Sequence, residues 1–293
     1  MNEYKYKSNY SKDEKLRESL YPLFNTVFGI SEGTFRDFHS RGLWDPTYTP
    51  YSFFSEDYAV ANVSTFVFSI ILDGELHEAA GIQSVMTHPH HRKKGLMNTL
   101  MDKALEEIDK NCNLSFLVTS EPSLYKKFGY RIINEFYYVK KYKHPGSPSG
   151  DLQGIDVFDS EGLNRLQKLF IENVPSSSVF YPVDYVHPFY LNMYNPHLRK
   201  LVHHSTSLDV LIMYEVVDNK LELFDVIGNT LPTLDQICSL IPEPFNEVHL
   251  FFNRDKFNMA FKIVEYDSPD KLMVRGDLKL SEHHLKLPIF AEF

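Results

Sequence analysis

The sequence predicts an α/β protein (α+β, with a mixed β-sheet). The chain is expected to form two consecutive domains, 1–145 and 146–293. The first observation is a strand, a basic turn and an amphipathic helix in immediate succession over residues 79–109. The second is a segment at 145–154 with two prolines and three glycines, a composition typical of a linker. The third is a weaker strand–helix–strand order at 221–252. A chain of 293 residues also exceeds what one hydrophobic core usually supports.

The composition excludes several classes of protein. With 43% hydrophobic and 24% charged residues, the chain is expected to fold throughout. A net charge of −9 argues against a nucleic-acid partner, which would require a basic face. Cys112 and Cys238 show neither metal spacing nor a disulfide framework, and the charged N-terminus does not resemble a signal peptide. The most apolar run, Tyr58–Leu72, is too short and too polar to span a bilayer, so we expect a cytoplasmic protein with no membrane partner.

Short periodic segments open the chain. Asp73-Gly74, between two apolar runs, is a strong signal for a two-residue β-hairpin. The loop Gly42–Pro50 holds the only tryptophan, Trp44, which either borders a binding pocket or fills a gap in the core. The elements expected before residue 79 are a strand at Tyr4–Tyr6, a helix at Ser11–Phe28, a helix at Glu32–Arg41, and strands at Tyr51–Phe54 and Tyr58–Leu72.

The segment 79–109 is the most informative part of the chain. Ala79–Thr87 is apolar, which suits a strand buried on both faces. From Met97 onward the apolar residues recur at helical spacing. Between them, Arg92-Lys93-Lys94-Gly95 places three cations and a glycine before the first turn of a helix, where amides are unpaired and the macrodipole is positive. This arrangement predicts a phosphate or pyrophosphate site.

Beyond the helix the pattern alternates between strands and helices. Gly129 is expected to end a short helix that begins at Pro122, and Thr233 is expected to cap a later one. The strands expected are Leu114–Val118, Tyr130–Ile133, Phe136–Tyr142, Leu208–Val217, Leu221–Ile227 and Glu247–Phe252, and the helices are Ser160–Val174, Pro182–Tyr194 and Leu234–Ile241.

Two motifs resemble a known superfamily. Arg92-x-x-Gly95-x-Met97 resembles motif A of the GNAT acetyltransferases, with Met97 departing from the usual glycine or alanine. Tyr125-x-x-Phe128-Gly129-Tyr130 resembles the motif B region of the same superfamily. Together they are similar to the enhanced intracellular survival (Eis) family and its tandem-GNAT relatives. The resemblance implies a GNAT fold followed by a second, degenerate GNAT-like domain that lacks the pyrophosphate turn.

The resemblance also implies a reaction, in which an amine attacks acetyl-CoA directly in a ternary complex. Tyr125 would protonate the departing thiolate, and the carboxylate of Phe293 would act as base, with Glu121 and a water chain as alternatives. Ser120 and Glu121 would also bind the cofactor, beside the gap that the acyl-pantetheine enters. Backbone amides would hold the cofactor: those of Val85, Met86 and Thr87 along the pantetheine, and those of Arg92, Lys93, Lys94, Gly95, Leu96, Met97 and Asn98 around the pyrophosphate.

Other interpretations remain open. A non-catalytic acyl-CoA-binding or regulatory protein would use the same fold. The histidines His88, His90 and His91 and the pairs His203-His204 and His283-His284 suggest a metal, but adjacent residues on a strand point to opposite faces, so we expect no metal. The expected partner is a small-molecule or peptide amine of unspecified identity, and the sequence leaves a homo-oligomer open.

Overall fold

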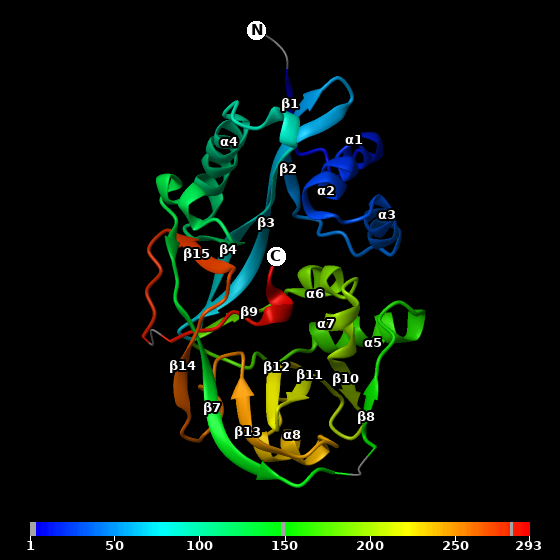
Figure 1. Ribbon diagram of the computed structural model, residues 1–293, viewed down its shortest axis with the longest axis vertical. Helices are drawn as coiled ribbons and strands as arrows, with labels where there is room; N and C mark the ends of the chain where they lie inside the picture. Colours follow the sequence, from blue (N-terminus) through cyan, green and yellow to red (C-terminus); the bar gives the residue numbers. More distant parts are fainter. Residues whose placement is uncertain (1–3, 148–149, 282–283) are drawn as a thin grey trace.

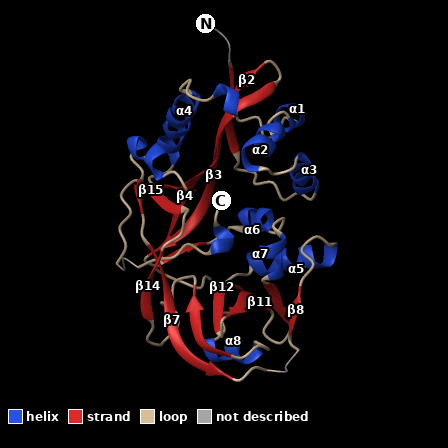
Figure 2. Ribbon diagram, viewed as in Figure 1, coloured by secondary structure: helices blue, strands red, loops and turns tan. Residues whose placement is uncertain are grey.

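The computed structural model describes residues 4–147, 150–281 and 284–293. Residues 148–149 of the predicted linker and His283 of the predicted histidine pair lie outside these ranges. Two mixed β-sheets, one in each half of the molecule, are flanked by helices (Figures 1 and 2). Within the described ranges, no helix has the length and apolar character needed to cross a bilayer.

The first sheet has the strand order β1-β2-β3-β4-β5-β15-β6, with β9 added beside β3. Helices α1, α2 and α3 lie on one side of this sheet and α4 on the other (Figure 1). The strands are β1 (Lys5–Ser8), β2 (Thr49–Ser55), β3 (Tyr58–Leu72), β4 (Glu75–Thr87), β5 (Ser115–Thr119), β6 (Arg131–Ile132), β9 (Phe180–Pro182) and β15 (Lys271–Arg275). The helices are α1 (Glu14–Glu18), α2 (Tyr21–Phe28), α3 (Glu32–Ser40) and α4 (Leu96–Asn111), with short 3₁₀ turns η1 (Pro89–His91), η2 (Pro122–Leu124) and η3 (Lys126–Phe128).

The second sheet has the order β14-β7-β13-β12-β11-β10-β8. Helices α5, α6 and α7 lie on the side that faces the first half, and α8 lies at the opposite end of the molecule (Figure 1). The strands are β7 (Glu135–His144), β8 (Leu152–Gly154), β10 (Val202–Ser205), β11 (Val210–Val217), β12 (Lys220–Gly228), β13 (Phe245–Leu250) and β14 (Lys262–Tyr266). The helices are α5 (Ser160–Ile171), α6 (Val186–Asn192), α7 (Pro196–Lys200) and α8 (Leu234–Leu240), with a final 3₁₀ turn η4 (Ile289–Ala291).

The two halves repeat one unit and exchange strands. In the first half, β3 and β4 are antiparallel, and α4 connects β4 to the parallel strand β5. In the second half, β11 and β12 are antiparallel, and α8 connects β12 to the parallel strand β13. Strand β7 leaves the first half to pair with β13 and β14, and β15 returns to lie between β5 and β6. The division into domains 1–145 and 146–293 stays a prediction, and the sheets exchange strands across that boundary.

Most local predictions agree with the structure. Asp73 and Gly74 both adopt positive φ, as a two-residue hairpin turn requires. Gly129 ends η3 in the left-handed conformation, and Thr233 caps α8. The helix predicted at 11–28 is instead two helices, because Pro22 in the first turn of α2 lacks the amide that a continuous helix would need.

One predicted helix begins too early. The segment 182–194 was expected to be helical, but residues 180–182 form β9, which pairs with residues 70–72 of β3 in the other half of the chain. Only Val186–Asn192 is helical. A strand this short has no periodicity of its own, so its conformation depends on the edge that it meets.

The C-terminal segment packs between the two halves. Leu285, Leu287 and Phe290 are buried among residues from both sheets. Figure 1 shows the end of the chain beside β3 and α6. The apolar end of the chain is therefore packed in the interior, and its last residue lies against the first sheet.

Candidate active site

An open strand edge lies at the centre of the first sheet. Strand β4 pairs with β5 only through Ala80–Ser115 and Gly81–Phe116. From there β4 continues to Thr87 and β5 to Thr119 with no further pairing between these two described strands. The strands thus separate, and Val85, Met86 and Thr87 lie on the open part of β4. Such an edge offers backbone groups to an extended ligand, as in β-strand addition.

A β-bulge redirects β4 at this point. Asn62 pairs with Met86 and Ser64 with Gln83, so β4 carries one extra residue there, and Ser84 has φ +54°. The Asn62 side chain donates a hydrogen bond to the Ser84 carbonyl at 2.8 Å. Gln83 and Ser84 therefore both lie on the side away from α4, whereas Val85 packs on the α4 side.

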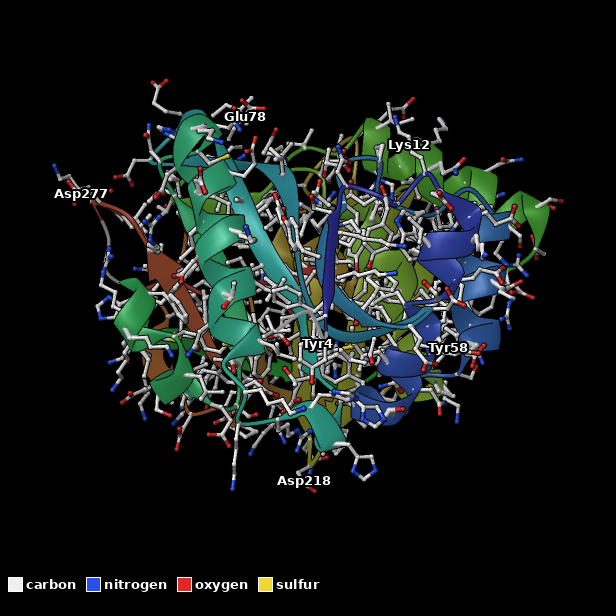
Figure 3. All side chains as sticks on the ribbon, turned by 90° about the horizontal axis from the view of Figure 1, so that it is seen from above. Tyr4, Lys12, Tyr58, Glu78, Asp218 and Asp277 are labelled. Carbon is white, nitrogen blue, oxygen red and sulfur yellow. The ribbon has the colours of Figure 1, made fainter. Side chains whose placement is uncertain are left out.

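The basic turn follows β4 directly. Gly95 is the N-cap of α4 with φ +76°, and no side chain caps the helix there. A Cβ built on Gly95 would meet nothing within 4 Å, so the space in front of the helix is open. Lys93 also has positive φ, and Arg92 Nε donates to the Thr87 carbonyl at 3.2 Å. The Lys94 ammonium donates to the Tyr4 hydroxyl at 2.7 Å, and Figure 3 shows Tyr4 between α4 and the N-terminal helices.

The first turn of α4 anchors the basic turn. Leu96 and Met97 pack into the core beneath the helix, so the long side chain of Met97 points away from the turn. Asn98 accepts a hydrogen bond from Lys127 at 2.6 Å, which connects the turn to the second motif. Uncapped amides, adjacent cations and open space at Gly95 together fit the diphosphate of a CoA thioester.

Tyr125 lies on the α4 side of the sheet. Its ring is 6% exposed and packs among residues of α4 and near Tyr130, at 6.3 Å between ring centroids. Burial raises the pKa of Tyr125 to about 12, and a hydrogen bond with Thr119 opposes that shift. The hydroxyl is therefore protonated at neutral pH, as a proton donor must be. Ser120 and Glu121 are exposed and directly follow the end of β5.

A cavity of about 330 Å³ lies on the opposite side of the sheet. Gln83 and Ser84 of the bulge and Val118 of β5 contribute to its wall, so the cavity reaches the point where the two strands separate. Its other walls are aromatic and acidic. The aromatic residues are Phe24, Phe35, Phe38, Trp44, Tyr48, Phe66 and Phe293, and the acids are Asp45, Asp270 and Glu292.

Phe293 lies in this cavity. Its ring meets Phe66 edge-on at 4.7 Å between centroids and lies 5.8 Å from Phe68. Tyr125 is not among the lining residues, because Val118 faces the cavity while the next residue, Thr119, contacts Tyr125. The structure thus brings Phe293 and the open β4 edge together, and it places Tyr125 across that edge.

Trp44 satisfies both interpretations of its loop. It lines the cavity and also packs against neighbouring rings, with Tyr48 at 5.3 Å and Phe38 at 6.1 Å between centroids.

Sequence reasoning missed Asp45, Asp270 and Glu292. Asp45 follows Trp44 and forms a local turn with Thr47, a signal available from the sequence, whereas Asp270 reaches the cavity only through the fold.

The tail is held by polar groups as well as by packing. Lys286 is fully buried, and its ammonium donates to Glu135 Oε1 at 3.0 Å and to the Leu287 carbonyl at 2.8 Å. The side-chain amide of Asn192 donates to the carbonyls of Phe290 and Glu292, each at 3.3 Å. These bonds determine where Glu292 and Phe293 lie.

Within the described ranges, no three histidine, cysteine or acidic side chains are grouped so as to hold a metal ion.

In the second half, the helix that corresponds to α4 begins differently. Thr233 and Gln236 form a reciprocal capping box at the start of α8, so donors that α4 leaves open are already bonded there. No cationic run precedes α8.

Comparison with protein-family profiles matches residues 10–133 to the acetyltransferase (GNAT) domain. These residues form a GNAT acetyltransferase domain. The GNAT domain thus includes the open strand edge, the basic turn and both sequence motifs. A search of curated proteins found no match.

Solved structures extend the fold likeness to the whole chain. Eis1 from Mycobacterium abscessus is 13% identical, with 93% of this chain and 73% of that one covered at a TM-score of 0.58. A GCN5-related N-acetyltransferase from Kribbella flavida is 14% identical, with 93% and 71% covered at 0.56. A probable N-acyltransferase from Enterococcus faecalis V583 is 16% identical, with 93% and 72% covered at 0.53. The predicted GNAT fold followed by a second GNAT-like unit is confirmed, and the likeness to the Eis family holds at the level of fold.

Proposed function

We propose that this protein transfers an acetyl group from acetyl-CoA to a primary amine, by direct attack within a ternary complex. One observation carries the proposal: the open edge of β4 joins an uncapped, cationic helix N-terminus to an aromatic, acid-lined cavity. A thioester lying along that edge would have its phosphates at α4 and its acyl group at the cavity. Acetyl-CoA supplies the activated acyl group when bound.

The residues of the chain would divide the work as follows. Amides of Val85, Met86 and Thr87 would hold and polarise the acyl-pantetheine, and the turn from Arg92 to Asn98 would hold the diphosphate. Tyr125 would give its proton to the departing sulfur, since its hydroxyl stays protonated well above neutral pH. Ser120 and Glu121 would border the entry to the gap.

The base is a separate part of the proposal. A carboxylate on Phe293 would lie on the cavity side of the sheet, where an amine would enter, and could take its proton. Glu121, which is exposed, remains the alternative, as does a water chain. Separately, the cytoplasmic location of the protein stays a prediction.

The first experiment targets the helix N-terminus. Gly95→Asp would place a carboxylate where the diphosphate must lie, so we expect calorimetric binding of acetyl-CoA to be lost and thiol release over an amine panel to stop. Gly74→Asp is the matched control, because Gly74 also has positive φ with nothing within 4 Å of its Cβ but lies in the β3–β4 hairpin. Equal affinity in the two variants would contradict the site. Binding of acetyl-CoA by the parent without thiol release would instead favour a non-catalytic acyl-CoA-binding protein.

A further inference from the structure

The cavity beside Phe293 has a chemical character that narrows its ligand. Its aromatic residues come from α2, α3, the loop before β2, β3 and the tail, so rings surround the space from several sides. Apolar walls of this kind favour a ligand body that needs no hydrogen bonds, because an unpaired polar group loses its hydration there. Aromatic faces also attract cations.

The charges at the cavity are predominantly negative. Asp45 and Asp270 lie on its wall, and Asp270 is exposed, which places it at the mouth. Glu292 lies 3.8 Å from the Lys286 ammonium, but that ammonium is closer to Glu135 at 3.0 Å, so one cation serves two carboxylates. Burial and repulsion from Glu135 and Asp270 raise the pKa of Glu292 to about 7. A cation bound beside Glu292 would lower this pKa and favour the charged carboxylate.

Positive groups are scarce by comparison. Among the described residues that line the cavity, His187 is the one basic side chain, and its Nδ1 lies 2.8 Å from the Leu43 carbonyl. The Lys286 ammonium is fully buried and committed to Glu135 and the Leu287 carbonyl. An incoming ammonium would therefore meet carboxylates and rings rather than competing cations.

Size sets the last limit. A cavity of about 330 Å³ lies at the small end of ligand pockets. We infer that the cavity binds a compact amine with one ammonium group on an aromatic or aliphatic body. A polyhydroxylated amine or a polyamine is disfavoured, because its additional hydroxyl or ammonium groups would lose hydration against the aromatic walls. This inference rests on the proposed function, because it takes the cavity as the site of the acyl acceptor.

The test uses the single tryptophan of the chain as a reporter. Trp44 lines the cavity, so its fluorescence responds to ligands that enter there. Four probes separate the features at issue: 2-phenylethylamine carries one charge on an aromatic body, glucosamine one charge on a hydroxylated body, spermidine several charges, and 2-phenylethanol none. We expect 2-phenylethylamine to bind at least about tenfold more tightly than each of the others. Equal affinity for glucosamine, spermidine or 2-phenylethanol would overturn the inference.

A pair of variants tests the charge directly. Asp270→Asn should weaken 2-phenylethylamine by about twofold to fivefold and leave 2-phenylethanol unchanged, since one partly screened ion pair is removed. Asp277→Asn is the matched control, because that aspartate is 77% exposed and pairs with Lys279 away from the cavity. Equal affinities for 2-phenylethylamine in the two variants would overturn the assignment of Asp270 as a partner of the ammonium.

Thiol release from acetyl-CoA, measured with the same amines, separates the two proposals. Selective binding of 2-phenylethylamine without thiol release would retain the inference about the cavity and refute the proposed function. Thiol release with an amine that leaves Trp44 fluorescence unchanged would retain acyl transfer and overturn the cavity as the acceptor site.

Discussion

Replacing Lys286 with methionine is expected to destabilise the protein more than any surface substitution. The Lys286 side chain has no exposed surface, and its ammonium lies 3.0 Å from Glu135 and 4.4 Å from the centroid of the Tyr266 ring. Methionine keeps most of the volume but removes the cation. Glu135, whose side chain is only 8% exposed, then loses its ionic partner.

The size of the effect follows from this burial. Removing one partner of a buried ion pair typically costs about 3–5 kcal/mol, because the remaining charge stays desolvated. The Glu135 carboxylate keeps one hydrogen bond, from the Leu287 amide at 2.9 Å, which limits the loss. In the double variant Lys286→Met with Glu135→Gln, that bond is retained without the charge, so much of the stability should return.

Urea unfolding followed by circular dichroism measures these differences. Lys279→Met is the matched control, because Lys279 also pairs with a carboxylate, that of Asp277 at 2.8 Å, but its side chain is 82% exposed. Its expected effect is within about 0.5 kcal/mol. If Lys286→Met unfolds at the same urea concentration as Lys279→Met, the buried pair does not stabilise the docked tail and the reasoning is refuted.

Three further predictions concern the chemistry and its pH dependence. Tyr125→Phe should lower turnover by about two to four orders of magnitude and leave acetyl-CoA affinity within a few-fold of the parent. Tyr130→Phe, at the neighbouring buried ring, should leave turnover unchanged, and equal rates in the two variants would make Tyr125 a packing residue. One glycine added after Phe293 should slow acetylation without weakening acetyl-CoA binding, and an unchanged rate would assign the base elsewhere. Burial raises the pKa of Asp225 to about 7, so its protonated form stabilises the fold fully below pH about 4, and this contribution is lost as the pH rises through 7. The melting temperature should therefore fall more between about pH 5 and pH 8 in the parent than in Asp225→Asn, and parallel curves would exclude that group as the cause.

Local sequence determined the parts of the site that lie within one turn of structure. Residues 79–109 form a strand, a cationic turn and a helix because periodicity, charge and a glycine act over neighbouring positions. The Asp73-Gly74 hairpin and the Thr233 cap are equally local, since each depends on the conformations open to one or two residues. The strand, the turn and the helix that carry the proposed cofactor-binding amides could therefore be predicted.

Only the tertiary structure decided what surrounds them. The exchange of β7 and β15, the bulge at Ser84 and the complete burial of Lys286 have no signal in nearby residues, because each depends on contacts with distant segments. The cavity is the clearest case, since Trp44, Asp270 and Phe293 meet only when both halves have packed. The type of a side chain alone does not determine which face of a sheet it lies on or which residues it contacts. Both depend on how distant segments pack once the long loops between elements have closed.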